Sequence, residues 1–264
     1  MAGRRTILDF LEMKRRGEKI VMLTSYDYIF TKILDEAGID GILVGDSLGM
    51  VVMGYETTLP VSMEDMLHHV EAVVNARPKA LVVADMPFMS YEASDEDALY
   101  NASKFIKIGA DAVKLEGGLE IARKVKMLVN AGIPVMGHIG LNPQRIRRLG
   151  RYRFVGRSEE EARYLLDSAK ALEEAGAFSI VLELVYSDVA KEITSSLDIP
   201  TIGIGSGPHC DGQILVVHDM LGLTPFKLSF VKRYLEMYTL AKEAIEKYID
   251  EVRRGEFPGP EHYR

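Results

Sequence analysis

Four strand-like apolar segments in this sequence each end in an acidic residue. The segments GILVGD, LVVAD, AVKLE and SIVLE end at Asp46, Asp85, Glu116 and Glu183. One architecture brings the carboxyl ends of separate parallel strands together at a single mouth, which is where its chemistry takes place. Carboxylates gathered at such a mouth suit a hard cation such as Mg²⁺, which prefers oxygen ligands. The pattern therefore predicts a metal site together with an acid or base.

The alternation within AVKLE indicates which of its side chains point inward. Side chains of a strand alternate between its two faces, so Ala112, Lys114 and Glu116 share one face. Val113 and Leu115 occupy the other face, which we expect to pack against helices. Lysine and glutamate are rarely buried without partners. An inward Lys114 and Glu116 would therefore need a ligand, a metal ion or each other.

Each of these polar residues also has a structural interpretation when it is taken alone. Asp85 precedes a Met-Pro pair and fits an ordinary turn, while Asp46 fits a loop cap. Glu183 fits a barrel acid that pairs with a lysine or arginine. His138, near the end of IPVMGHIG, fits a packed core histidine, or a hydrogen bond to substrate rather than a metal ligand. The metal hypothesis depends on the recurrence of acids at equivalent strand ends.

Strand-like and helix-like segments alternate along the chain, which predicts a parallel sheet. Polar strand ends spread over most of the sequence favour a single (β/α)8 barrel over residues 1–264 rather than a doubly wound sheet with one switch point. We expect a short helix over residues 7–16, between Thr6 and Gly17, and a long final helix over roughly 227–254. The expected strands cover residues 19–25, 39–45, 80–86, 111–116, 133–140, 178–184, 199–205 and 213–221.

Composition excludes several classes of protein. The chain has 264 residues with 47% hydrophobic content and a net charge of −7, which argues against a nucleic-acid-binding surface. Charges or glycines interrupt every apolar segment before it reaches membrane-spanning length, and the N-terminus lacks the apolar segment of a secretory signal. Cys210 is the only cysteine, so no disulfide can form within the chain. We therefore expect a cytoplasmic protein that binds neither nucleic acid nor membranes.

Several longer motifs are distributed over nearly the whole chain. The longest, VGDSLGMVVMGYETTLPVSMEDM, spans residues 44–66, and ADMPFMSY, AVKLEGG and VMGHIGLNPQ follow it. TIGIGSG, DGQILVVHDMLGL and the terminal RGEFPGPEHYR complete the set. Together these motifs resemble those of the ketopantoate hydroxymethyltransferase family. The resemblance implies a TIM barrel of the phosphoenolpyruvate/pyruvate-type superfamily.

The resemblance also implies a reaction and its components. Members of this family transfer a hydroxymethyl group from 5,10-methylenetetrahydrofolate to 3-methyl-2-oxobutanoate, which yields 2-dehydropantoate. This is the first step of pantothenate and coenzyme A biosynthesis. The resemblance further implies one Mg²⁺ per subunit, small molecules as the only substrates, and a homo-oligomer, commonly a decamer.

The matched motifs assign roles to individual residues by resemblance. Glu183 matches the general base that removes the C3 proton of the oxoacid. The residues that match substrate contacts are Asp46, Ser47, Asp85, Lys114 and His138. The residues that match Mg²⁺ ligands are Asp46, Asp85 and Glu116. Two alternatives stay open, namely a Mg²⁺-dependent 2-oxoacid lyase or aldolase that needs no folate, and a non-catalytic barrel.

A basic loop follows His138 in the sequence. Its arginines are Arg145, Arg147, Arg148, Arg151, Arg153 and Arg157. A run of this kind is usually a solvated surface or an ion-pair network. A sharper hypothesis is that the loop attracts the acidic glutamyl tail of the folate.

Overall fold

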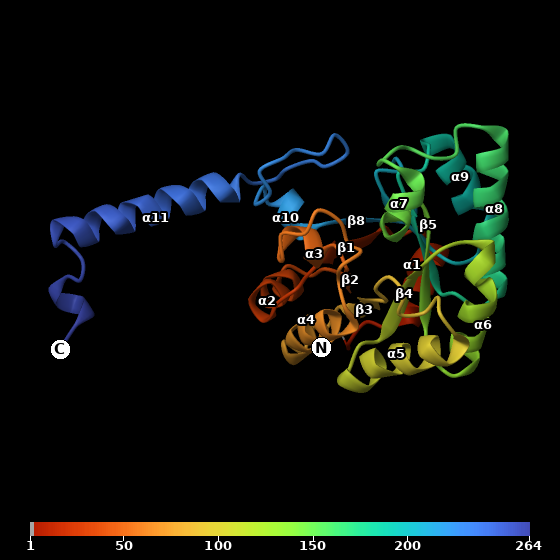
Figure 1. Ribbon diagram of the computed structural model, residues 1–264, viewed down its shortest axis with the longest axis horizontal. Helices are drawn as coiled ribbons and strands as arrows, with labels where there is room; N and C mark the ends of the chain where they lie inside the picture. Colours follow the sequence, from red (N-terminus) through yellow and green to blue (C-terminus); the bar gives the residue numbers. More distant parts are fainter. Residues whose placement is uncertain (1–2) are drawn as a thin grey trace. The chain divides into compact units, whose positions relative to one another are not determined.

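The computed structural model describes residues 3–264 and contains a closed barrel of eight parallel strands (Figure 1). The strands follow one another around the barrel in chain order, and β1 pairs with β8 to close it. Their bounds are β1 (Ile20–Thr24), β2 (Gly41–Val44), β3 (Leu81–Asp85), β4 (Ala112–Glu116), β5 (Val135–Gly140), β6 (Ser179–Glu183), β7 (Thr201–Ile204) and β8 (Gly212–Leu215). The barrel predicted from the alternating pattern is confirmed.

Helices follow each of the first six strands, and the longer ones pack on the outside of the barrel (Figure 1). They are α2 (Tyr28–Glu36), α3 (Leu48–Val51), α4 (Met63–Asn75), α5 (Asp95–Ile108), η1 (Leu119–Ile121), α6 (Ala122–Asn130), η2 (Pro143–Arg145), α7 (Ile146–Leu149), α8 (Glu159–Glu174) and α9 (Ser187–Ser196). Serine side chains begin three of them, since Ser62, Ser94 and Ser158 each accept a hydrogen bond from a first-turn N–H. Residues 205–211 join β7 to β8 without a helix.

The first helix, α1 (Ile7–Arg16), closes the N-terminal end of the barrel. Thr6 caps it and Gly17, with φ of 66°, ends it, as the sequence predicts. Phe10 is fully buried and lies edge-on to the Phe178 ring, 6.2 Å between centroids, just before β6 begins. The apolar cluster around it comprises Met13, Ile20, Met22, Leu43, Leu81, Val83, Ala112, Met136, Phe178, Val181, Ile202 and Ile214.

The inward face of the strands changes from apolar to polar towards the carboxyl end. Val83, Ala112, Met136 and Val181 belong to the buried apolar cluster. Because side chains on one strand face repeat every two residues, the next positions on that face can be assigned directly. On these four strands they are Asp85, Lys114, His138 and Glu183. The barrel therefore has an apolar lower half and a charged mouth.

The C-terminal residues, Val217–Arg264, form a compact unit of their own. This unit contains α10 (Val217–Met220), α11 (Met237–Arg254) and η3 (Pro260–His262). The long final helix is present, but its predicted start near residue 227 is wrong. The guanidinium of Arg233 donates to the carbonyl oxygens of Thr224 and Phe226, which holds the residues before Met237 in an irregular loop.

The last strand is also shorter than predicted. It ends at Leu215, and residues 217–220 turn into α10, so His218 and Asp219 lie on a helix rather than at a strand end. An apolar run of this length does not by itself distinguish a strand from a buried helical turn. No helix among residues 3–264 is long and apolar enough to cross a membrane. The organisation of residues 1–264 as one domain stays a prediction.

Candidate active site

Six charged or ionisable side chains from five successive strand ends meet at the mouth of the barrel. They are Asp46 after β2, Asp85 on β3, Lys114 and Glu116 on β4, His138 on β5 and Glu183 on β6. The strand register places Asp85 beside Lys114 and Glu116 beside His138. All of the predicted site residues except Ser47 belong to this cluster, and Ser47 follows Asp46 directly.

Lys114 supplies the positive charge at the centre of the cluster. Its Nζ lies 2.8 Å from Oδ1 of Asp85, and both side chains are almost completely buried. Burial opposes the charged form of Lys114, but the carboxylates of Asp85, Glu116 and Asp46 outweigh it and raise the pKa of the lysine. Lys114 therefore stays an ammonium ion despite its burial. Burial raises the pKa of Asp85, whereas Lys114 opposes this rise.

Around Lys114, the three carboxyl groups of Asp46, Asp85 and Glu116 outnumber the single ammonium group. The backbone N–H of Asp46 donates to Oδ2 of Asp85, 3.2 Å away. Burial, followed by the charges of Asp85 and Glu116, raises the pKa of Asp46 well above its usual range. An uncompensated group of buried carboxylates is costly, and a bound cation would relieve the repulsion.

The donor chemistry fits a hydrated hard cation. No three or more His, Cys, Asp or Glu side chains among residues 3–264 are arranged as a direct ligand set. Mg²⁺, however, commonly binds through only one or two carboxylates and keeps several waters. Asp46, Asp85 and Glu116 supply buried carboxylate oxygens of this kind. These residues therefore fit Mg²⁺ held partly through water.

His138 links Lys114 and Glu116 to Glu183. Its Nδ1 lies 3.2 Å from Nζ of Lys114 and 3.5 Å from Oε1 of Glu116, and its Nε2 lies 3.1 Å from Oε2 of Glu183. Burial and Lys114 oppose protonation, but the carboxylates of Glu116 and Glu183 raise the pKa of His138 to about 9. For Glu116, burial opposes ionisation, but hydrogen bonding and charge from His138 lower the pKa of this acid.

Glu183 is the acid of the cluster that is open to solvent. Its side chain is 15% exposed, compared with 2% for Glu116. The end of β5 approaches β6 closely here, because the N–H of Leu141 donates to the carbonyl of Glu183 at 2.8 Å. Gly140 makes this approach possible, since a Cβ at this position would lie 2.3 Å from the same carbonyl oxygen. The carboxylate of Glu183 is therefore accessible to a substrate that enters the mouth of the barrel.

Ser47 directly follows Asp46 and is the N-cap residue of α3. Its Oγ is 2.8 Å from the hydroxyl of Tyr26, and either group can donate. Tyr26 is only 2% exposed, so this contact holds the serine side chain in one position. Ser47 is thus placed to donate a hydrogen bond at the mouth.

Comparison with known proteins identifies the family of this chain. A model described as ketopantoate hydroxymethyltransferase matches residues 4–260. The chain belongs to the ketopantoate hydroxymethyltransferase family. It is 61% identical to the 3-methyl-2-oxobutanoate hydroxymethyltransferase of Pyrobaculum aerophilum over 264 residues, which is 100% of both chains. The protein of the same name from Geobacter metallireducens is 55% identical over 264 residues and 99% of both chains.

Solved structures with the same fold are more distant from this ketopantoate hydroxymethyltransferase family member. A 2,3-dimethylmalate lyase of the PEP mutase/isocitrate lyase superfamily superposes with a TM-score of 0.63 at 15% identity, covering 96% of this chain and 89% of that one. Phosphonopyruvate hydrolase in complex with oxalate and Mg²⁺ gives a TM-score of 0.63 at 13% identity, covering 95% and 88%. These likenesses confirm the predicted (β/α)8 barrel fold.

The family motifs did not reveal two further residues of the site, Gln144 and Tyr91. Gln144 is 3% exposed and its side chain donates to Oδ2 of Asp46, while Tyr91 is 1% exposed and its hydroxyl contacts both Gln144 and the backbone of Glu116. The available signal was weak: Gln144 ends the motif VMGHIGLNPQ and is one of only two glutamines in the chain.

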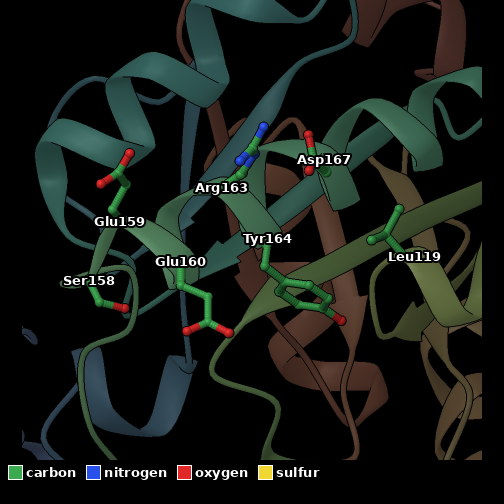
Figure 2. Close-up of a pocket in the computed structure, with 7 residues that line it drawn as sticks. All are labelled: Leu119, Ser158, Glu159, Glu160, Arg163, Tyr164 and Asp167. Atoms are coloured by element: carbon green, nitrogen blue, oxygen red, sulfur yellow. The ribbon is translucent and has the colours of Figure 1, made fainter.

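A groove of about 690 Å³ lies on the outside of the barrel, over η1 and the first half of α8 (Figure 2). Its lining residues are Leu119, Ser158, Glu159, Glu160, Arg163, Tyr164 and Asp167. None of the site residues implied by the family resemblance lines it. Its three acids make it unsuitable for an anionic oxoacid, so the charged mouth is the better candidate for the active site.

The arginines of the loop after β5 divide into two groups. Arg145 pairs with Glu120, and Arg153 pairs with Glu161 at 2.6 Å, so these two form ion pairs. The other four are exposed and pair with no acid within the described residues, namely Arg147, Arg148, Arg151 and Arg157. Tyr152, in the same loop, reaches Sδ of Met50 at 3.9 Å. Met50 lies on α3, which begins just after Asp46 and Ser47, so this contact places the loop beside the site.

Proposed function

We propose that this chain transfers a hydroxymethyl group from 5,10-methylenetetrahydrofolate to 3-methyl-2-oxobutanoate and forms 2-dehydropantoate, on the route to pantothenate and coenzyme A. The main support for this proposal is the match of residues 4–260 to the ketopantoate hydroxymethyltransferase family. We also propose that the enzyme works in the cytoplasm, in keeping with a single free and buried cysteine, Cys210.

The buried acids provide the proposed binding site for Mg²⁺. Asp46, Asp85 and Glu116 would hold the ion directly or through water, one ion per subunit. When bound, Mg²⁺ would act as a Lewis acid on the oxoacid and make its C3 proton easier to remove. The excess of carboxylates over cations in this part of the cluster supports the proposal.

The remaining polar residues would bind the oxoacid and move its proton. Lys114 stays charged and can neutralise the substrate carboxylate or the developing oxyanion. Ser47 and His138 can donate hydrogen bonds to its oxygens. Glu183 would accept the C3 proton as general base. Its contact with Nε2 of His138 at 3.1 Å keeps the carboxylate oriented towards the interior of the mouth.

One assay tests the proposed reaction and its alternative. The chain is incubated with 3-methyl-2-oxobutanoate, with and without Mg²⁺ and with and without 5,10-methylenetetrahydrofolate, and 2-dehydropantoate is quantified. We expect product only when both additions are present. Cleavage or condensation of 2-oxoacids without folate would instead favour the lyase or aldolase. No reaction with any 2-oxoacid would favour the non-catalytic barrel.

The exposed arginines of the loop after β5 would attract the folate tail. We predict that replacing Arg147 and Arg148 together by Gln raises the KM for a polyglutamylated folate about 2- to 10-fold at low salt, with a smaller effect at high salt. The KM for the oxoacid should not change. Arg15→Gln on α1, at the N-terminal end of the barrel, serves as control. An equal folate KM in the double variant and the control would refute this role.

We also propose a homo-oligomer, a decamer by the family resemblance. The structure of α11 supports association, because none of its residues is buried although it carries exposed apolar side chains. These include Tyr238, Ile245, Tyr248, Ile249 and Val252, which follow a helical spacing along one side. An apolar stripe left open along a helix of this length marks a contact surface.

Charges placed on this stripe should reduce the size of the assembly. We predict that the double variant Ile245→Glu and Ile249→Glu sediments as a smaller species than the unaltered chain in analytical ultracentrifugation. Gln at both Glu243 and Lys247, on the other side of α11, is the matched control and should leave the mass unchanged. A single species of 29.4 kDa for the unaltered chain would contradict the oligomer itself.

A further inference from the structure

Gln144, in η2 just after β5, contacts groups at the ends of three other strands. Its side-chain Nε2 donates to Oδ2 of Asp46 at 2.9 Å and to the carbonyl oxygen of Met86 at 2.9 Å. Its backbone N–H donates to Oε2 of Glu116 at 3.1 Å. Its side-chain Oε1 lies 3.0 Å from the hydroxyl of Tyr91. One residue thus contacts groups that follow β2, β3 and β4.

The chemistry of these partners determines which way the amide group points. The carboxylate of Asp46 and the carbonyl of Met86 can only accept, so the NH₂ end with its two N–H groups must face them. The carbonyl end then faces Tyr91, whose hydroxyl can donate. Every polar group of the buried Gln144 side chain therefore has a complementary hydrogen-bond partner.

Few other side chains meet these requirements. Glutamate would place a second carboxylate against that of Asp46 and against the Met86 carbonyl, and neither partner has a proton to donate. Methionine or leucine fills the same space but leaves two acceptors without donors, which is costly when they are buried. Asparagine is one carbon shorter and cannot keep all the contacts at these distances.

We propose that Gln144 is a positioning residue that sets the orientation of the Asp46 and Glu116 carboxylates for the divalent cation. It engages Oδ2 of Asp46 and leaves Oδ1 of that carboxylate for a ligand, and it engages Oε2 of Glu116, whose Oε1 faces Nδ1 of His138 at 3.5 Å. Hydrogen bonds that orient the ligands of a metal commonly contribute 10- to 100-fold to its affinity. This inference rests on the proposed Mg²⁺ role of the two acids.

Tyr91 acts on Gln144 from the other side. Its hydroxyl also accepts the backbone N–H of Glu116 at 3.2 Å, so it contacts the backbone of one acid and the residue that orients both. Its ring is 1% exposed and packs in the core. The phenylalanine variant therefore removes only the hydroxyl contacts and keeps the ring.

The test is a titration of the full-length protein with Mn²⁺ in the presence of 3-methyl-2-oxobutanoate, with free Mn²⁺ read by electron paramagnetic resonance. We expect Gln144→Met to bind Mn²⁺ about 10- to 100-fold more weakly than the unaltered protein. In steady-state kinetics, the apparent KM for metal and oxoacid should rise while the KM for folate stays the same. A residue that only stabilised the fold would lower the melting temperature without this selectivity.

Gln213→Met is the matched control, because Gln213 is the only other glutamine and is exposed on β8. It should bind Mn²⁺ like the unaltered protein. If Gln144→Met does not fold, the titration is made with Tyr91→Phe instead. We expect this variant to bind Mn²⁺ about 2- to 10-fold more weakly than the unaltered protein. Unchanged affinity in the variant that folds overturns the role of Gln144 and leaves the proposed function intact. An unaltered protein that binds no Mn²⁺ overturns the proposed metal site and this inference together.

Discussion

The Glu183→Gln variant should lose exchange of the C3 proton of 3-methyl-2-oxobutanoate by about 10²- to 10⁴-fold, the range over which general bases contribute. Gln has the same shape as Glu and can still contact Nε2 of His138, but its amide cannot accept the proton. The oxoacid should still bind, because Lys114 and the buried acids are unchanged. The loss should therefore appear in kcat and leave the binding constant of the oxoacid nearly unaltered.

Proton NMR in D₂O measures the exchange directly, without the folate. Binding of the oxoacid is followed separately by calorimetry with Mg²⁺ present. Glu160→Gln is the control and should exchange at the native rate, because Glu160 is an exposed acid on α8 that lines the separate groove and not the mouth. Native exchange in Glu183→Gln would remove this residue as the base, and we would then look for the proton acceptor among the other side chains of the mouth.

Lys114→Met should have the second large effect, on activity and on stability together. The variant keeps the length of the side chain but removes the ammonium group that lies 2.8 Å from Asp85. Asp85 and its neighbours then remain buried without their cation. Breaking one partner of a buried ion pair typically costs about 3–5 kcal/mol of unfolding free energy. We also expect kcat/KM to fall about 10³-fold, because the oxoacid loses its charged partner.

Both effects can be measured on one preparation. Urea unfolding gives the stability change, and kinetics at a temperature well below the unfolding transition give the activity change of the folded fraction. Lys107→Met on α5 is the control, because Lys107 is exposed and its loss should be nearly neutral in both measurements. A Lys114→Met variant as stable as this control would show that the buried acids do not depend on the lysine.

The sequence allowed the inward faces of the strands to be predicted because that information is local. The alternation in AVKLE separates Lys114 and Glu116 from Val113 and Leu115 without reference to any other segment. The structure buries Lys114 to 3% and Glu116 to 1% exposure, with Ala112 in the apolar core beneath them. The same repeat of two places Asp85 above Val83 and Glu183 above Val181. Strand periodicity and the acids at strand ends therefore predicted most of the cluster.

Predictions failed where one local pattern permits two structures. The run over residues 213–221 is apolar enough for a strand, yet only its first part pairs with β1 and β7, and the rest forms α10. The stretch before Met237 has helical composition, but contacts of Arg233 to the backbone of Thr224 and Phe226 hold it as a loop. In both cases tertiary partners, and not the local pattern, decided the outcome.

From its residues alone, this chain could be assigned a β/α barrel, its family and the acids at its mouth, because helix and strand periods, caps and contiguous motifs lie within short stretches. Only the tertiary structure decided which of these groups touch. The contacts of Gln144 to Asp46 and of His138 to Glu183 join residues 98 and 45 positions apart, and they exist because the closed barrel brings successive strand ends to one rim. Distances of this kind depend on how every strand between the two residues packs, so no local pattern contains them.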